Sequence, residues 1–191
     1  MKKVLLLLAN GFEFFEASVF IDVIGWNMEE GDCSTKLYTC GVTKEIKSAF
    51  GHKLIADYLI DEVDVNDFDA LAIPGGFEVY DFYNDAYSNK FTKLIQDFKA
   101  NGKFIASICA GALPLGKSGI LKGKNGTTYR SEVRREALKN FGVNVLDQPI
   151  VIDDNIITSW NPSTAAGVAF LLLELLTNKE NVEKVRQLMG F

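Results

Sequence analysis

Histidine and positive charge are both scarce in this chain. His52 is the only histidine among 191 residues, which excludes most zinc sites and every Ser-His-Asp or Cys-His-Asp triad that does not use His52. We expect this histidine to lie exposed at a strand edge rather than to act as a base. Lysine and arginine number 20 against 25 aspartates and glutamates, so the net charge is −5. Because no basic stripe offsets this balance, the composition argues against a nucleic-acid partner.

Cysteines and long apolar runs are scarce as well. Three cysteines, an odd number without paired spacing, do not form a disulfide framework and indicate a reducing compartment. Cys33 and Cys40 are expected to be packing residues. The run from Val4 to Ala9 is shorter than the core of a secretion signal, and the run from Ala165 to Leu176 is too short for a membrane span and contains Glu174. We therefore expect a cytoplasmic protein with no membrane partner.

Strand-like and helix-like segments alternate along the whole chain, a pattern that predicts a mostly parallel sheet wrapped by helices. The expected strands are Lys3–Leu8, Lys36–Cys40, Lys53–Ala56, Asp69–Ile73, Lys103–Ile108, and the antiparallel pair Ile150–Asp153 and Ile156–Ser159. The expected helices are Glu13–Glu30, Asn89–Ala100, Ala110–Lys117, Ser131–Asn140, Ser163–Leu176 and Glu180–Met189. No repeat or linker interrupts the chain, so residues 1–191 are expected to form one domain. No Gly-rich phosphate loop is present, so nothing predicts nucleotide binding.

The strongest local signal is the segment from Lys103 to Leu115, in which a buried strand ends at Cys109 and a helix follows immediately. Ala110 and Gly111 permit a tight turn that presents the cysteine at the carboxyl edge of the sheet, as in a nucleophile elbow. A helix N-terminus beside the sulfur favours the reactive thiolate. The alternative is a buried cysteine that acts as a small hydrophobic residue. The spacing favours the nucleophile.

Glu16 interrupts the apolar face that we expect for the first helix. At about 100° per residue, that face carries Phe12, Phe15, Val19, Phe20 and Val23. An ionised carboxylate is costly to bury, so Glu16 is expected to pair with a cation or to keep its proton. A protonated carboxyl could donate a hydrogen bond to the Cys109 thiolate and exchange that proton with a substrate. Alternatively, a tilted helix lets Glu16 reach solvent or cap a backbone group.

A third element is the turn Pro74-Gly75-Gly76 at the end of another predicted strand. Successive glycines let backbone N–H groups point into a site, as an oxyanion hole requires, although such a sequence can also be only a turn. Parallel sheets bind ligands at the carboxyl ends of their strands, where Cys109 is also expected. The aromatic residues that follow recur at helical spacing, which favours core or dimer packing over a pocket lining: Phe77, Tyr80 and Tyr83.

Together these residues resemble the ThiJ/PfpI superfamily, and most closely its DJ-1 branch. The matching pieces occur in the family's order: Gly11 with Glu16, Pro74-Gly75-Gly76, Ile108-Cys109-Ala110-Gly111, and Ile157-Thr158-Ser159 with Pro162. The resemblance implies a flavodoxin-like three-layer α/β sandwich, as in class I glutamine amidotransferases, and usually a homodimer. It also implies a reactive Cys109 hydrogen-bonded to a protonated Glu16, without metal or organic cofactor. The oxyanion contacts would come from Gly75, Gly76 and the N–H of Ala110.

The chain departs from the family pattern at three places. The protease branch has a histidine directly after its cysteine, whereas this chain has Ala110. Some DJ-1 relatives have a histidine after the paired threonines, whereas Tyr129 stands here, and its role is left open. The family's Arg-Gly-Pro is replaced by Trp160-Asn161-Pro162. An intracellular amidase or peptidase is therefore the weakest expectation, because no residue of the chain is identified as the general base that it needs, unless a partner subunit contributes one.

Two functions follow from an activated Cys109. In the first, of the glyoxalase or deglycase type that the resemblance implies, the thiolate attacks a carbonyl carbon of a small dicarbonyl such as methylglyoxal. Glu16 then relays a proton between the carbons, and hydrolysis releases a hydroxy acid. In the second, the chain is a redox-responsive, chaperone-like stress protein, and oxidation of Cys109 alters its association with partners.

Overall fold

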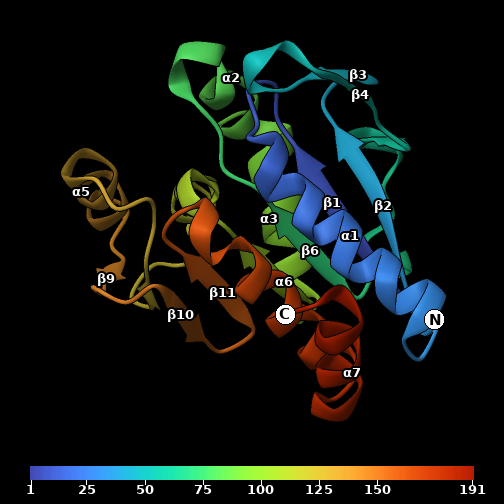
Figure 1. Cartoon of the computed structure of the whole chain (residues 1–191). Coiled ribbons are helices and arrows are strands. Elements are labelled where there is room, and N and C mark those ends of the chain that lie inside the picture. The colour runs from blue at the N-terminus through green and yellow to red at the C-terminus, as the bar shows by residue number, and fades with distance from the viewer.

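The computed structural model describes residues 1–191, and its centre is a seven-stranded sheet in the order β10-β11-β7-β6-β1-β2-β5 (Figure 1). Every neighbouring pair is parallel except β10 with β11. The strands are β1 (Lys2–Leu8), β2 (Thr35–Gly41), β5 (Tyr58–Leu59), β6 (Ala70–Ile73), β7 (Phe104–Ser107), β10 (Ile150–Asp153) and β11 (Ile156–Ser159). The mostly parallel sheet predicted from the alternating pattern is confirmed.

Helices cover both faces of this sheet. On one face lie α1 (Phe14–Glu30), α6 (Ala165–Leu176) and α7 (Lys179–Met189), which pack against one another, and Figure 1 shows α1 and α6 in front of the strands. On the other lie α3 (Asn89–Ala100) and α4 (Ala112–Lys117), with α2 (Phe82–Ala86) beside α3 and α5 (Glu132–Asn140) beside α4. The three-layer sandwich is therefore confirmed. No helix is long and apolar enough to cross a membrane.

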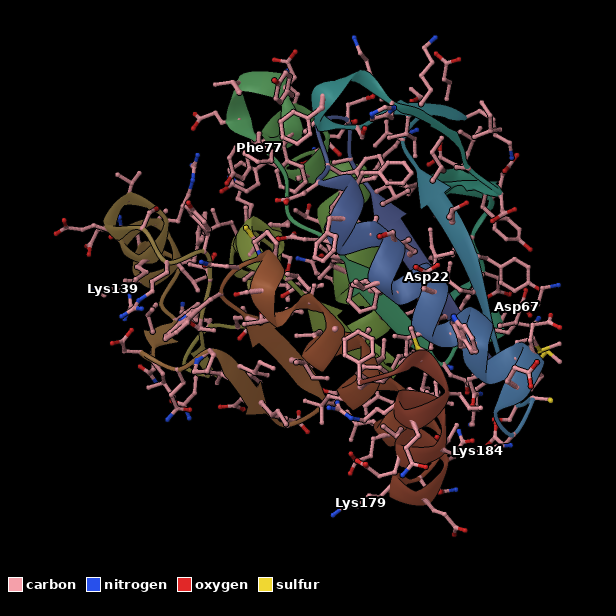
Figure 2. All side chains as sticks on the ribbon, viewed as in Figure 1. Asp22, Asp67, Phe77, Lys139, Lys179 and Lys184 are labelled. Carbon is pink, nitrogen blue, oxygen red and sulfur yellow. The ribbon has the colours of Figure 1, made fainter.

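The core explains why the central strands are continuously apolar. Residues Val4 to Leu8 of β1 are fully buried, because the strand is covered by helices on both faces. Forty-nine buried residues form one cluster, so the interior on the two sides of the sheet is continuous. Charged side chains such as Asp22, Lys139 and Lys184 project outward from this core (Figure 2).

The buried face of α1 differs from the predicted one. Its buried residues are Glu16, Ala17, Phe20, Val23, Ile24 and Asn27. Phe15 is 57% exposed, so its placement on the core face was wrong. Phe12 is buried, but it precedes the helix and forms an isolated bridge with Gly76. The helix is thus rotated relative to the expected stripe, and this rotation brings Glu16 fully into the interior.

A buried amide network fixes α1 against α7. Asn27 donates through Nδ2 to Thr35 Oγ1 at 2.8 Å and to Asp32 Oδ1 at 2.9 Å. Its Oδ1 accepts a hydrogen bond from Asn181 Nδ2 at 2.6 Å. Because every polar atom of the Asn27 side chain has a partner, the network holds the helix that carries Glu16 in one orientation.

Several short segments lie outside the predicted sheet. The segment expected as a strand over Lys53–Ala56 forms β4 (Lys53–Ile55), but it pairs with β3 (Glu45–Lys47) in a separate hairpin. Two further short strands, β8 (Asn125–Gly126) and β9 (Asn144–Val145), pair with each other. His52 is exposed as predicted, next to the Phe14 ring at 6.1 Å between centroids.

The two remaining cysteines differ from each other. Cys40 is buried in the core as expected, whereas Cys33 is exposed, so its assignment as a packing residue was wrong. Cys33 has a φ of 59°, in the turn that follows α1. That turn places its side chain at the surface.

Candidate active site

Three adjacent strands deliver the candidate residues to one edge of the sheet. The segments after β1, β6 and β7 carry Glu16, Pro74-Gly75-Gly76 and Cys109, and these strands are neighbours in the sheet. From β1 the chain first builds β2 and β5 on one side and then β6 and β7 on the other. Open α/β sheets bind ligands at such a reversal, at the carboxyl ends of the strands.

Cys109 lies in a strained turn between β7 and α4. Its φ is 58°, in the left-handed region, which costs a non-glycine residue roughly 1–2 kcal/mol. The turn is held by Ile108 N–H, which donates to Ile73 O at 3.1 Å, and by the buried Thr128 hydroxyl, which donates to Cys109 O at 2.8 Å. The tight turn expected after the strand is therefore present, and Thr128 is a supporting residue that the sequence did not reveal.

Glu16 is completely buried beside the Cys109 turn. Gly75 N–H donates to its Oε2 at 2.6 Å, whereas its Oε1 is buried without a hydrogen-bond partner. The alternative in which Glu16 reaches solvent is therefore wrong, whereas the alternative in which it caps a backbone group holds for one of its two oxygens. The other oxygen is free for a proton shared with Cys109.

The charges of the two groups are coupled. Burial, and then the nearby Glu13 charge, raise the pKa of Glu16 to about 8. Burial and the Glu16 charge also raise the pKa of the Cys109 thiol, while the Ala110 N–H lowers it. Simultaneous ionisation of Glu16 and Cys109 is thus unfavourable, and near neutral pH the pair carries at most one negative charge. A thiolate at Cys109 requires a protonated Glu16.

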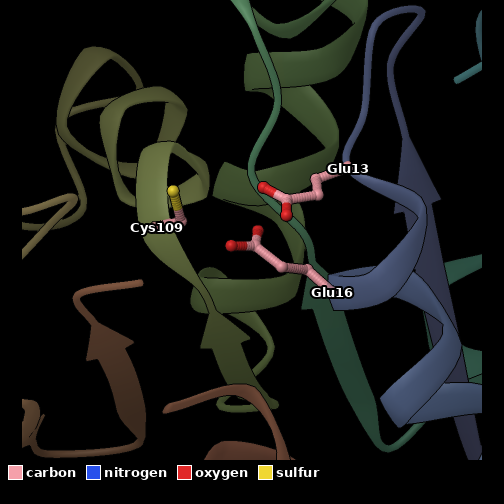
Figure 3. Close-up of side chains that lie close together, drawn as sticks. All are labelled: Glu13, Glu16 and Cys109. Carbon is pink, nitrogen blue, oxygen red and sulfur yellow. The ribbon is translucent and has the colours of Figure 1, made fainter. Parts of the chain in front are cut away.

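Glu13 is the third ionisable group of the site, and no role was predicted for it from the sequence. Its carboxylate, that of Glu16 and Cys109 Sγ have ligand atoms that all lie within 4.8 Å of one another (Figure 3). Burial raises the pKa of Glu13 as well. Residues three apart at a helix start share one face, so its spacing to Glu16 was the available signal. These three side chains form the one group that could ligate a metal ion, and the expected absence of a metal stays a prediction.

A cavity of about 530 Å³ opens above Cys109. Its lining residues are Glu13, Gly76, Phe77, Glu78, Val79, Cys109, Ala110, Tyr129, Arg134, Asn161 and Pro162. Glu16 is absent from this lining. Arg134 is held by a 2.8 Å hydrogen bond from Nη2 to Glu78 Oε2, and its guanidinium lies 5.0 Å from the centroid of the Tyr83 ring. The cavity thus has one fixed cation, Arg134, and two carboxylates, Glu13 and Glu78.

The predicted oxyanion contacts are only partly available. Because Gly75 N–H donates to Glu16, it is not free for a substrate oxygen, and its expected role is corrected to positioning that carboxyl. Gly76 and Ala110 both line the cavity, and the N–H of Gly76 has no partner within the chain. These two residues remain the oxyanion candidates.

Of the three aromatic residues expected at helical spacing after the glycines, only Tyr83 packs against the core. Phe77 is 37% exposed and lines the cavity, and Tyr80 is 43% exposed, so neither is a core residue, and packing of these residues in a dimer stays a prediction. Asp81 breaks the expected helical spacing because its φ is 64°. Tyr129 also lines the cavity, whereas Arg134 and Asn161 come from distant segments for which no local pattern predicted a role.

The chain is similar to known proteins of one family. The family profile described as DJ-1/PfpI family matches residues 2–175. Deglycase TK1284 of Thermococcus kodakarensis is 33% identical over 163 residues, which cover 84% of this chain and 90% of that protein. YraA of Bacillus subtilis, provisionally named a cysteine protease, is 35% identical over 161 residues, with coverage of 84% and 90%. The crystal structure of DJ-1beta from Drosophila melanogaster superposes with a TM-score of 0.85 at 28% identity, covering 98% of this chain and 97% of that one.

Proposed function

This chain belongs to the DJ-1/PfpI family, and we propose that it is a cysteine-dependent enzyme of glyoxalase or deglycase type that acts on small reactive carbonyls such as methylglyoxal. The observation that carries the proposal is the close placement of Cys109 Sγ and the Glu16 carboxyl under a cavity of about 530 Å³. The deglycase name of the Thermococcus relative supports the same class. The proposed reaction needs neither a metal nor an organic cofactor.

The shared proton explains how a buried thiol becomes a nucleophile. In the state of the pair with one negative charge and the proton on Glu16, Cys109 is the thiolate, and the Ala110 N–H stabilises it. When Glu16 loses the proton, its charge opposes the thiolate. The reactive state is therefore thiolate with neutral carboxyl.

The proposed reaction is an internal oxidation and reduction. The thiolate attacks the aldehyde carbon, and the aldehyde oxygen, facing Gly76 and Ala110, takes the proton of Glu16 to give a hemithioacetal. A base removes the hydrogen of that carbon to leave an enediolate, whose hydroxyl proton moves to the second oxygen. A proton then returns to the second carbon, giving a 2-hydroxyacyl thioester. Water cleaves this ester to the hydroxy acid and regenerates the Cys109–Glu16 pair.

The redox-responsive alternative uses the same residues. Glu16 Oε1 is buried without a partner, so a protonated Glu16 could donate a hydrogen bond to a sulfenic or sulfinic oxygen on Cys109. An amidase or peptidase stays the weakest candidate. The cavity contains no histidine, because His52 lines a separate hollow.

A homodimer is part of the proposal. Several apolar side chains stand exposed around the start of α1 and the β3–β4 hairpin: Phe14, Phe15, Phe50 and Ile55. Exposed apolar groups at neighbouring positions favour burial against a second copy. Light scattering during gel filtration tests this, and a monomeric mass at micromolar concentration contradicts it. A cytoplasmic location and the absence of a nucleic-acid partner stay predictions.

Turnover of methylglyoxal to lactate tests the enzymatic proposal. We expect the wild-type protein to release lactate, with Cys109→Ser as the blank and Cys33→Ser as the matched control. Methylglyoxal should also protect Cys109, but not the exposed Cys33, from iodoacetamide. Lactate release that persists in Cys109→Ser contradicts the proposal. Peroxide oxidation of Cys109 that changes association, in a protein without turnover, favours the redox alternative.

A further inference from the structure

Two carboxyl groups flank Cys109, but only one of them lines the cavity. Glu13 is half-buried and belongs to the lining, whereas Glu16 has no exposed surface and does not. In Figure 3 both side chains extend from the start of α1 toward the Cys109 turn. A substrate bound in the cavity can therefore contact the Glu13 carboxyl, whereas Glu16 exposes no surface to the cavity.

One oxygen of the Glu16 carboxyl is already occupied by a hydrogen bond. Its Oε2 accepts the 2.6 Å hydrogen bond from Gly75 N–H, which fixes the carboxyl from behind. Its remaining oxygen is the one available to exchange a proton with Cys109 or with the oxygen that replaces the thiolate charge. Because this oxygen of Glu16 already exchanges one proton, the Glu16 carboxyl is poorly placed to carry a second proton from the first substrate carbon to the second.

The backbone around Glu13 is anchored to the glycine turn. Its N–H donates to Gly75 O at 2.8 Å, and Phe77 N–H donates to Gly11 O at 3.0 Å, so two hydrogen bonds tie its backbone segment to the glycine turn. Its carboxylate lies within 4.8 Å of Cys109 Sγ. A substrate carbon bonded to Cys109 Sγ lies only one bond length from the sulfur, so the hydrogen on that carbon is within reach of the Glu13 carboxylate.

We propose that Glu13 is the base that takes the hydrogen from the first carbon of the Cys109 hemithioacetal and returns a proton to the second carbon. The inference rests on the proposed function. Glu13 accepts the proton as the enediolate forms and gives it up as the thioester forms, so it ends each cycle as it began. The first carbon is oxidised and the second is reduced by the same electron pair, and no outside oxidant is needed. Glu16 keeps the proton exchange with sulfur and oxygen.

Glu13→Gln separates these roles, because glutamine preserves size and removes the base. We expect kcat for methylglyoxal to fall about 100-fold, with KM and the iodoacetamide rate of Cys109 within about threefold of wild type. Glu13→Asp keeps an acid on a shorter arm and should recover part of the loss. Glu132→Gln, an exposed carboxylate on α5 outside the cavity, controls for the change in net charge. A wild-type kcat in Glu13→Gln overturns the assignment.

Isotope content gives a second test that needs no variant. When the wild-type protein converts methylglyoxal in D₂O, a proton-carrying side chain that is exposed to the cavity exchanges its proton with solvent before returning it to the substrate. We therefore expect deuterium at carbon 2 of nearly all of the lactate. Lactate that retains the substrate hydrogen indicates a shielded carrier such as Glu16 and overturns the proposal. If the wild-type protein does not convert methylglyoxal, the proposed enzymatic function is rejected. If Glu13→Gln converts it as fast as wild type, only the role of Glu13 is rejected.

Discussion

Replacing Gly75 with alanine is expected to lower the free energy of unfolding by about 3 kcal/mol and to reduce turnover more than about 1000-fold. A Cβ at this position would lie 2.8 Å from three atoms: Ala110 N, Cys109 Cβ and Glu16 Oε2. Two of these belong to the strained turn, and the third is a buried carboxyl already bonded to Gly75 N–H. None can move without separating Cys109 from Glu16, so one methyl group disturbs both stability and chemistry.

The same substitution elsewhere provides the control. Gly25 lies within α1, is exposed, and has no atom within 4 Å of an added Cβ. Gly25→Ala is expected to stabilise the protein by about 0.5–1 kcal/mol, because alanine is the better helix former. Urea unfolding measures the stability of Gly75→Ala and Gly25→Ala, and methylglyoxal assays measure their turnover. Equal stability of Gly75→Ala and wild type would mean that the turn is not packed as described.

The elements that sequence predicted best are those governed by local pattern. The buried strand before Cys109, the small residues after it, and the glycine turn after β6 all follow from neighbours in the chain. Their convergence followed from one topological rule, that parallel strands end at a common edge. The sheet and the Cys109 turn were therefore predictable without tertiary information.

The residues whose positions or roles were not predicted correctly are those placed by tertiary contacts. Phe15 was placed inside because a helical wheel weights aromatic residues, whereas the buried Asn27–Asn181 contact sets the true rotation of α1. Arg134 enters the cavity only because α5 packs beside α4, and its partner Glu78 lies 56 residues away. Gly75 was assigned to a substrate oxygen because the sequence cannot show that Glu16 has already taken its N–H. In each case a long-range contact overrides the local rule.

The charge state of Glu16 leads to the second large effect. Glu16→Gln is expected to make the protein more stable than wild type by about 5 kcal/mol at pH 8 and above. The pKa of Glu16 is about 8 in the folded protein against 4.5 for an ordinary glutamate, because of burial. Each pKa unit corresponds to about 1.4 kcal/mol, which gives about 5 kcal/mol for ionising this group in place. Glutamine has the same shape, can still accept from Gly75 N–H, and carries no charge.

The sign of the pH dependence follows from proton binding. Between about pH 4.5 and 8 the folded protein keeps the Glu16 proton, whereas the unfolded chain has released it. Unfolding therefore releases a proton in this window, and the wild-type free energy of unfolding falls as the pH rises. Above about pH 8 both states are ionised, and below about pH 4.5 both are protonated, so this contribution levels off at each end.

Urea unfolding at a series of pH values from 5 to 9 measures the difference between the two proteins. Acidic groups whose pKa is lowered, such as Asp69 and Asp153, add opposite slopes, but they are present in both proteins and cancel in the difference. The stability advantage of Glu16→Gln should grow steadily with pH and reach its plateau near pH 8, while the exposed Glu132→Gln shows no such trend. A difference that does not change with pH would mean that Glu16 ionises normally. Such a carboxyl could not hold the proton that a Cys109 thiolate requires, so this thermodynamic curve tests the chemistry of the site without any substrate.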